Sequence, residues 1–378
     1  MRSRTAGVIV VDNGSTDGVG DAVRERFPHA RIVRLDENSG FTGGVAAGVN
    51  ASDADAVILL NNDAIPEPGW LEALVRRLES AGDDVIAAGG RIVDSTGALA
   101  DFVRGVMTFD GHAFQPGFRM PLSNVSEPEN GAEIFFACGG NMIVRRREFI
   151  SLGGFDQDYF AYLEDVDFGW RAWLSGFRII YDTTAVVRHK SAATSDRLGA
   201  YERGVLFEKN ALQTAIKNYD DELLREAAGS IFLTFLHRLH QYSTSRNGNT
   251  SGLLAPPIGE KRSRPRGSLD GSRLSQMRRR LGRRISARRH AVVIDDPLTM
   301  MQFRAAEWFF TNIDRIAEKR ETVQRGRKRS DNEIFERFPL HYVATYEGDG
   351  ELMRSRLFEL LKPRVSSVTK TLADMMKR

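Results

Sequence analysis

Residues 57–63, Val-Ile-Leu-Leu-Asn-Asn-Asp, constrain this chain most, because an apolar run ends abruptly in two amides and a carboxylate. A short apolar run bounded by polar residues predicts a strand buried on both faces, as in a parallel sheet covered by helices. Asp63 then lies at the carboxyl end of the strand, where ligands bind in open α/β sheets. A carboxylate there is suited to hold a divalent cation against a phosphate, although it can also simply end a strand.

The composition is that of an ordinary globular protein, with 42% hydrophobic and 27% charged residues in a chain of 378. Its apolar runs are shorter than the roughly 18 residues that span a bilayer, and the start of the chain lacks the shape of a signal peptide. The single cysteine, Cys138, cannot form an intrachain disulfide, which fits a reducing compartment. We therefore expect a cytoplasmic protein.

Strands and helices alternate through the first half of the chain. Apolar runs predict strands at residues 6–11, 31–35, 57–60, 85–88 and 134–144, and helical spacing predicts helices at 19–27, 45–51, 70–78 and 145–152. Residues 91–131 give no assignable pattern, and a strand pair at 178–181 and 185–188 leads to His189. The alternation predicts an α/β fold with a doubly wound, Rossmann-like parallel sheet.

Beyond residue 195 long helical patterns dominate. We expect a catalytic domain at 1–195, a helical extension at 196–241, a basic Ser/Gly/Arg-rich linker at 242–291 and a C-terminal helical region at 292–378. Residues 230–240 are expected to be buried, and residues 297–320 and 353–377 to be helical. Apolar residues at helical spacing among arginines predict a basic amphipathic helix at 273–289. Three roles fit that helix: it presents a solvated charged face, it contacts an anionic membrane peripherally, or it binds phosphate groups nonspecifically. No motif indicates specific nucleic-acid binding.

Three acidic or imidazole positions follow in order at strand ends or at a helix start: Asp63, the pair Glu164 and Asp165, and His189. Sugar transfer from a nucleotide donor needs a divalent cation at the diphosphate and a carboxylate that takes the acceptor proton. Asp63 and His189 suit Mn²⁺ or Mg²⁺. Asp165 suits the base, and Glu164 either supports it or binds the acceptor. Each position also has a structural explanation, since acids cap helices and histidines end strands.

Four stretches stand in order: Val-Val-Asp-Asn-Gly-Ser-Thr-Asp-Gly at 10–18, Asn-Ser-Gly-Phe-Thr-Gly-Gly at 38–44 and on to residue 50, Leu-Leu-Asn-Asn-Asp at 59–63, and Gly-Gly-Phe-Asp at 153–156 with Tyr-Leu-Glu-Asp-Val-Asp at 162–167. Together they resemble the bacterial family-2 glycosyltransferases of the rhamnosyltransferase-like branch. The resemblance covers roughly residues 7–195 and implies a nucleotide-binding domain of the glycosyltransferase A type.

The resemblance also implies roles for individual residues. The donor-binding set would be Asp12, Asn13, Gly14, Ser15, Asn38, Gly40, Phe41, Gly44, Asn61 and Asn62, with Asp12 at the nucleotide base. Asp63 would be the ligand in a variant Asp-X-Asp metal motif, and His189 a second metal contact. Asp165 would be the general base of an inverting transfer. A direct displacement needs only one base, whereas retention through a covalent intermediate also needs a nucleophile, and Glu164 keeps that second route open.

Two departures from the family pattern stand out. The family usually begins with a further strand and helix, so we expect that the natural start lies upstream, that the sequence is a truncated form, or that another element takes that place. In addition, the metal motif carries only one carboxylate, Asp63, so metal binding should depend on the diphosphate itself.

The sequence therefore predicts an inverting glycosyltransferase that moves rhamnose or another deoxyhexose from a dTDP- or UDP-linked donor. Its acceptor would be a glycan, a polyprenyl-linked or a small molecule of the cell envelope, and the enzyme would lie in the cytoplasm or at the inner face of the membrane. The oligomeric state stays open. The alternatives are a nucleotidyltransferase, which usually has a basic glycine-rich loop where this chain has Asp17, and a non-catalytic nucleotide-sugar-binding scaffold.

Overall fold

The computed structural model describes residues 6–190, 193–244, 297–344, 346, 348–371 and 375. The first elements are β1 (Ile9–Asn13), α1 (Val19–Arg26), β2 (Arg31–Leu35), α2 (Gly40–Asn50), β3 (Ala56–Leu60), β4 (Ala64–Pro66), α3 (Trp70–Ser80) and β5 (Val85–Asp94). These are followed by β6 (Ala100–Phe102), β7 (Val106–Met107), β8 (Ala113–Phe114), the 3₁₀ turn η1 (Leu122–Asn124), β9 (Asn141–Arg145), α4 (Arg146–Ser151), the 3₁₀ turn η2 (Gln157–Tyr159), α5 (Glu164–Leu174) and β10 (Arg178–His189).

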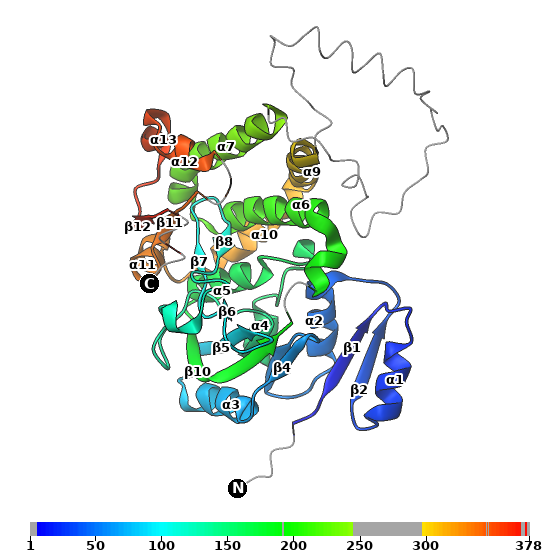
Figure 1. The fold of residues 1–378 in the computed structure, drawn as a ribbon. Helices are drawn as coiled ribbons and strands as arrows, with labels where there is room; N and C mark the ends of the chain where they lie inside the picture. The colour runs from blue at the N-terminus through cyan, green and yellow to red at the C-terminus, as the bar shows by residue number, and fades with distance from the viewer. Residues whose placement is uncertain are drawn as a thin grey trace, which may run out of the picture.

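The rest of the described chain is mainly helical (Figure 1). Its elements are α6 (Ala193–Asn218), α7 (Asp221–Thr244), α9 (Pro297–Thr311), α10 (Ile313–Arg325), α11 (Asp331–Arg337), β11 (Leu340–Tyr342), α12 (Asp349–Met353), α13 (Arg356–Leu361) and β12 (Ser367–Thr369). The predicted α/β class with a helical C-terminal region is confirmed. The prediction of helix throughout 353–377 is wrong, because α13 there is short and β12 pairs in parallel with β11.

A six-stranded sheet forms the centre of the fold, in the order β3-β9-β5-β10-β4 with β6 paired to β5. The prediction that this sheet is parallel is wrong: only β5 and β10 are parallel. Strand β9 runs antiparallel to β3 and β5, β4 runs antiparallel to β10, and β6 runs antiparallel to β5. The strand predicted at 57–60 is also less buried than expected. It lies at an edge of this sheet, and of its side chains only Leu59 is buried.

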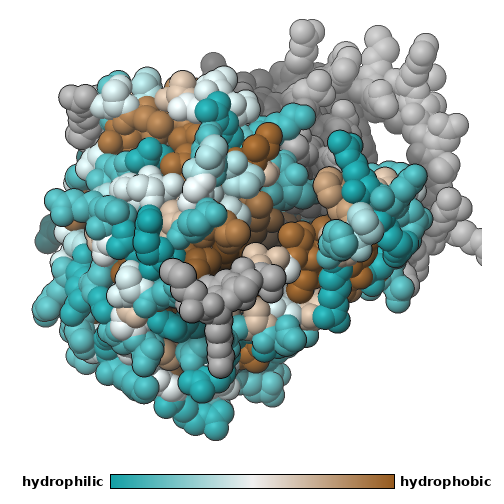
Figure 2. All heavy atoms as spheres, turned by 90° about the horizontal axis from the view of Figure 1, so that it is seen from below, coloured by the Kyte–Doolittle hydropathy of each residue, from teal (hydrophilic) through white to brown (hydrophobic). Residues whose placement is uncertain are grey.

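Strands β1 and β2 form a separate parallel pair, which has no hydrogen-bonded partner in the central sheet among the described residues. Figure 1 shows this pair with α1 at one side of the molecule. In Figure 2, apolar side chains gather in the hollow between that lobe and the main body. Val8, before β1, is 61% exposed, and Leu60, at the end of β3, is 39% exposed. The alternating pattern predicted that Asp12 and Asp63 follow strands of one sheet. That prediction is wrong, because Asp12 is on β1 and Asp63 follows β3 of the central sheet.

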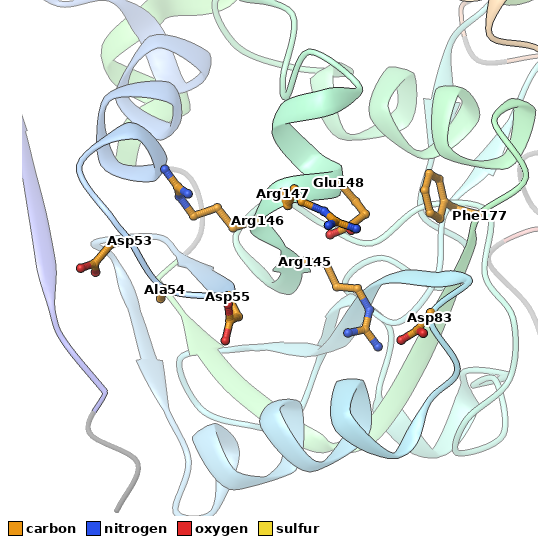
Figure 3. A pocket seen from close by; sticks show the side chains of 9 residues that line it. All are labelled: Asp53, Ala54, Asp55, Asp83, Arg145, Arg146, Arg147, Glu148 and Phe177. Carbon is orange, nitrogen blue, oxygen red and sulfur yellow. The ribbon is translucent and has the colours of Figure 1, made fainter. Parts of the chain in front are cut away.

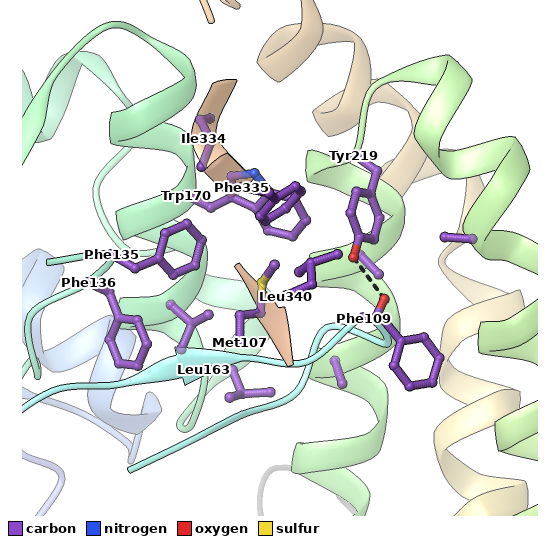
Figure 4. Close-up of a cluster of buried hydrophobic side chains, with 14 of the residues drawn as sticks. Met107, Phe109, Phe135, Phe136, Leu163, Trp170, Tyr219, Ile334, Phe335 and Leu340 are labelled. Carbon is purple, nitrogen blue, oxygen red and sulfur yellow. Dashed lines mark hydrogen bonds between the residues drawn. The ribbon is translucent and has the colours of Figure 1, made fainter. Parts of the chain in front are cut away.

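The main hydrophobic core joins distant segments of the chain (Figure 4). Trp170 on α5 packs edge-on against Tyr219, after α6, and against Phe335 on α11. The C-terminal helices thus cover the helix that begins with Glu164 and Asp165. The four segment boundaries remain predictions, and the basic helix expected at 273–289 lies outside the described residues.

Two further predictions concern the helices. The burial expected at residues 230–240 is only half right, because Phe232 on α7 is 58% exposed. The strand pair expected before His189 is one strand, β10, whose pairing with β5 shifts register between Asp182 and Val186. None of the helices described here has the length and apolar character needed to span a membrane.

Candidate active site

The loop after β1 and the start of α2 are tied together by two asparagines. Asn13 Nδ2 donates to Asn38 Oδ1 at 3.2 Å and to the Gly40 carbonyl at 2.8 Å, and its Oδ1 accepts from the Ser39 amide at 2.9 Å. Gly14 has a φ of 73°, and a Cβ there would lie 2.6 Å from the Glu37 backbone, so only glycine fits. The predicted helix at 45–51 is corrected here: it already begins at Gly40. Two of its first-turn amides are engaged within the protein, because the Gly40 amide donates to Asn38 Oδ1 and the Thr42 amide donates to the Phe160 carbonyl.

Asp12 organises its own turn. It is 3% exposed, its Oδ1 accepts from the Ser15 amide at 3.0 Å, and Arg34 Nε lies 3.5 Å from its Oδ2. The hydrogen bonds from Ser15, aided by Arg34, lower the pKa of this carboxyl. Gly20 packs on Oδ2, since a Cβ there would lie 2.6 Å from it. Asp12 and Ser15 thus shape the loop, and contact with a nucleotide base stays a prediction.

A glycine pair, Gly139 and Gly140, lies where predicted donor-binding residues meet the predicted base. A Cβ on Gly139 would lie 3.0 Å from the Phe41 ring, and one on Gly140 would lie 2.8 Å from Asn61 Nδ2. The Gly139 amide donates to Asp165 Oδ2 at 3.2 Å. This glycine pair is therefore a point of close approach, and it brings the end of β3 next to the start of α5.

Asp63 and His189 lie side by side, at the end of β3 and at the last residue of β10. His189 Nε2 is 3.0 Å from Asp63 Oδ1, and His189 Nδ1 is 2.7 Å from Asp101 Oδ2. The hydrogen bond to Asp101 is the main cause of a raised His189 pKa, with further contributions from Asp63. Asp101 fixes the imidazole so that Nε2 faces Asp63, an arrangement typical of histidines that bind metals.

Glu164 and Asp165 begin α5 in an environment that disfavours their charged forms. Burial raises the pKa of Asp165 to about 6, opposed by backbone hydrogen bonds from Gly139 and Val166. Burial, and then the charge of Asp165, raises the pKa of Glu164 well above its ordinary value. Glu164 is 6% exposed and its Oε2 has no hydrogen-bond partner. Within the described part of the chain no lysine or arginine pairs with either carboxylate, so neither charge is neutralised.

Comparison with known proteins identifies the family of this chain. The sequence model described as "Glycosyl transferase family 2" matches residues 5–153. The N-acetylglucosaminyl-diphospho-decaprenol L-rhamnosyltransferase of Mycobacterium tuberculosis is 31% identical over 215 residues, which are 51% of this chain and 69% of that protein. The chain belongs to glycosyltransferase family 2.

Two further similarities are more partial. The O-antigen biosynthesis protein RfbC of Myxococcus xanthus is 31% identical to this family-2 glycosyltransferase over 199 residues, 49% of this chain and 15% of that protein. Among solved structures, that of GalNAc-T7 with UDP, GalNAc and Mn²⁺ matches 66% of this chain and 47% of its own, with 13% identity and a TM-score of 0.45. A structural similarity that low carries no argument. The predicted family, enzyme class and glycosyltransferase A fold are confirmed by the family membership.

Of the predicted site residues, Asn13, Asn38 and Gly40 form one contact group, and Asn61 and Asp165 meet at the glycine pair. Asn62 is exposed, and a Cβ on Gly44 would lie 3.6 Å from Asn13 Nδ2. The structure brings these residues together but leaves their roles as predictions. Sequence reasoning missed Asp101, which lies in the unassigned stretch at 91–131. The one sequence signal that could have drawn attention to it is an acid within the short apolar run Leu-Ala-Asp-Phe-Val.

A cavity of about 530 Å³ lies at the other end of β3 (Figure 3). Asp55 precedes β3, and Arg145 pairs with the first residue of that strand, whereas Asn141 pairs with the last. The cavity's arginines are partly engaged: Arg145 donates to the Val85 carbonyl and Arg146 to the Val49 carbonyl. This glycosyltransferase therefore keeps its unpaired acids and its arginine-lined cavity at opposite ends of the strand.

Proposed function

We propose that this chain is an inverting, divalent-metal-dependent glycosyltransferase with Asp165 as its general base. The observation that carries the proposal is a carboxylate at the start of α5 that has no cationic partner among the described residues and accepts from the Gly139 amide, next to the Gly140 that packs on Asn61. Burial raises its pKa to about 6. A base with a pKa near neutrality is deprotonated at working pH and still takes a proton readily. Glu164 would bind or orient the acceptor hydroxyl through its unpartnered Oε2.

The residues at the end of β3 fit a divalent cation. Asp63 Oδ1 and His189 Nε2 are 3.0 Å apart, and a carboxylate oxygen and an imidazole nitrogen are both ligands that Mn²⁺ accepts. Among the described residues no group of three or more acidic, histidine or cysteine side chains is placed to hold a metal. Asp63 and His189 would therefore share the ion with diphosphate oxygens and water, and the ion would neutralise the leaving diphosphate.

In the reaction, the acceptor oxygen attacks the anomeric carbon while Asp165 takes the hydroxyl proton. The bond from that carbon to the diphosphate oxygen breaks, and its electron pair leaves with the diphosphate. The start of α2, which Asn13 and Asn38 hold in place, would lie against the donor phosphates or sugar, with the positive end of the helix dipole toward them. One displacement of this kind inverts the anomeric configuration.

The relatives support a proposal for the donor sugar. The mycobacterial protein's name, an N-acetylglucosaminyl-diphospho-decaprenol L-rhamnosyltransferase, supports a deoxyhexose donor and a polyprenyl-linked acceptor. We therefore propose rhamnose from a dTDP- or UDP-linked donor, and an acceptor at the inner face of the membrane. The proposed donor and acceptor specify the enzyme class further, and they rest on the relative's name together with the site geometry.

The test is a panel of nucleoside-diphosphate sugars with Mn²⁺, assayed for thermal shift, for donor hydrolysis and for transfer to polyprenyl-diphosphate-linked N-acetylglucosamine. Stabilisation and turnover with a deoxyhexose donor are expected. Binding without hydrolysis or transfer of any donor would instead indicate a scaffold. Equal binding with and without Mn²⁺ would remove the metal assignment.

A further inference from the structure

The four residues before Glu164 have an unusual backbone. Phe160, Tyr162 and Leu163 have φ angles of 63°, 72° and 65°, and Arg119 is the only other non-glycine residue with a positive φ in the described chain. Side chains with a Cβ rarely adopt such angles, so three of them within four residues need restraint from the surrounding structure. This strained segment leads directly into Glu164 and Asp165.

Asn210, in the middle of α6, supplies that restraint. Its Nδ2 donates to the carbonyl oxygens of Tyr159, Ala161 and Tyr162 at 3.1, 2.9 and 2.7 Å. Asn210 is fully buried, and its Oδ1 accepts from Lys209 Nζ and from Gln213 Nε2, both at 3.0 Å. Because both donors can reach only the oxygen, the amide has one orientation, with its NH₂ group facing the strained segment.

The same segment also contacts the donor-side helix. The Thr42 amide donates to the Phe160 carbonyl at 3.2 Å, and a Cβ on Gly40 would lie 2.4 Å from that oxygen. A shift of the segment would therefore move the start of α5 relative to the first turn of α2. Asn210 lies well outside the stretch at 5–153 that matches the family model.

We propose that Asn210 is a positioning residue, whose three hydrogen bonds hold the segment at 160–163 so that Asp165 faces the acceptor and the donor at the same time. The proposal rests on the proposed role of Asp165 as the base. Asn210 does not touch the reacting atoms; it acts through the backbone that carries the base. Holding reacting groups in place is worth large factors in rate, because small displacements already slow a reaction.

Asn210→Asp is the direct test, since it keeps the shape but turns an oxygen toward three carbonyl oxygens. The matched control is Thr214→Val, one turn further along α6. It removes the hydrogen bond of 2.6 Å to the Tyr159 hydroxyl and leaves the three carbonyl contacts in place. Both variants alter one fully buried polar side chain of the same helix.

Two readouts separate positioning from stability. Hydrogen exchange of the peptide at 157–167 should quicken in Asn210→Asp and stay as in wild type in Thr214→Val. The value of kcat should fall about hundredfold in Asn210→Asp, with little change in the donor KM. The acid limb of its pH profile should also move below pH 6, because a loosened segment lets water reach Asp165. Wild-type exchange and pH profile in Asn210→Asp, or the same changes in Thr214→Val, would overturn the proposal.

The exchange measurement needs no substrate, so it tests Asn210 even if Asp165 proves not to be the base. Transfer by Asp165→Asn at the wild-type rate would remove the base assignment and leave the exchange result standing. If Asn210→Asp shows no cooperative unfolding, Gln213→Met takes its place, because it removes one of the two donors that orient the amide. Faster exchange at 157–167 in that variant supports the proposal, and unchanged exchange overturns it.

Discussion

The first turn of α5 carries acidic residues in opposite electrostatic settings. Glu164 and Asp165 have raised pKa values and no cationic partner among the described residues. Asp167, two residues later, is fully buried, yet Arg171 Nε and Lys217 Nζ each lie 2.8 Å from it. Burial alone would raise the Asp167 pKa, but these two cations more than offset it and lower that pKa.

This difference in pairing separates an acid that stabilises the fold, Asp167, from two acids that are candidates for catalysis, Glu164 and Asp165. Lys217 bridges Asp167 and Asp156, and so joins α6 to the segment before α5. A buried acid that is paired in this way is a structural element. A buried acid that remains unpaired is retained at a cost in stability, which is typical of functional sites. The following predictions test that division.

The largest effect is expected for Asp165→Asn. The transfer rate should fall about 10³-fold or more, since an amide cannot take the acceptor proton. The melting temperature should rise, because a disfavoured charge is removed. Steady-state kinetics and calorimetry measure both, and a rate within a fewfold of wild type would show that Asp165 is not the base.

Asp167→Asn should act on stability instead. Its loss leaves Lys217 and Arg171 buried with one carboxylate fewer, which costs about 3–5 kcal/mol of unfolding free energy. Activity per folded molecule should change little. The control is Asp21→Asn, which breaks an exposed pair with Arg24 and should cost less than about 1 kcal/mol. Equal unfolding free energies for the two variants would contradict the division.

Asp101→Asn should weaken the binding of Mn²⁺ in the presence of nucleoside diphosphate by about 10- to 100-fold. The reason is that an amide holds the His189 ring less firmly than the carboxylate 2.7 Å from Nδ1. Glu67→Gln is the control, because Glu67 pairs with the neighbouring Arg188 and not with His189. Isothermal calorimetry with unchanged affinity would exclude Asp101 from the metal site.

The smallest effect concerns stability and pH. The folded Asp165 pKa of about 6 lies above the ordinary 3.8. Between these values the folded protein binds more protons than the unfolded one, so this group's contribution to stability falls as pH rises through the window. The gain in melting temperature of Asp165→Asn over wild type should therefore be least near pH 4 and greatest at pH 7. A pH-independent gain would contradict the raised pKa.

Local signals in the sequence predicted much of the fold and part of the site. The bounds of β2 and the start of α3 at Trp70 follow from short apolar runs and helical spacing, and both match the structure. The sequence placed Glu164 and Asp165 at the start of a helix, and Asp63 and His189 at the ends of strands. In the structure Asp63 Oδ1 and His189 Nε2 are 3.0 Å apart. Motifs in order along the chain were sufficient to locate these residues at the ends of their helix and strands.

The remainder depends on contacts between distant residues. Asn210 lies about fifty positions from the carbonyls that it binds, and no local pattern announces that contact. Asp101 became visible only when β6 paired with the extended end of β5. The separation of β1 and β2 from the central sheet was missed for the same reason, because an apolar run predicts a strand but not its neighbours.

The central claim is that one carboxylate, Asp165, acts as a base in a single displacement. The most direct measurement is the anomeric configuration of the product, determined by NMR from a donor of known configuration. Inversion is predicted. Retention would contradict the account, because it requires a second group to act as nucleophile and would move that role to Glu164.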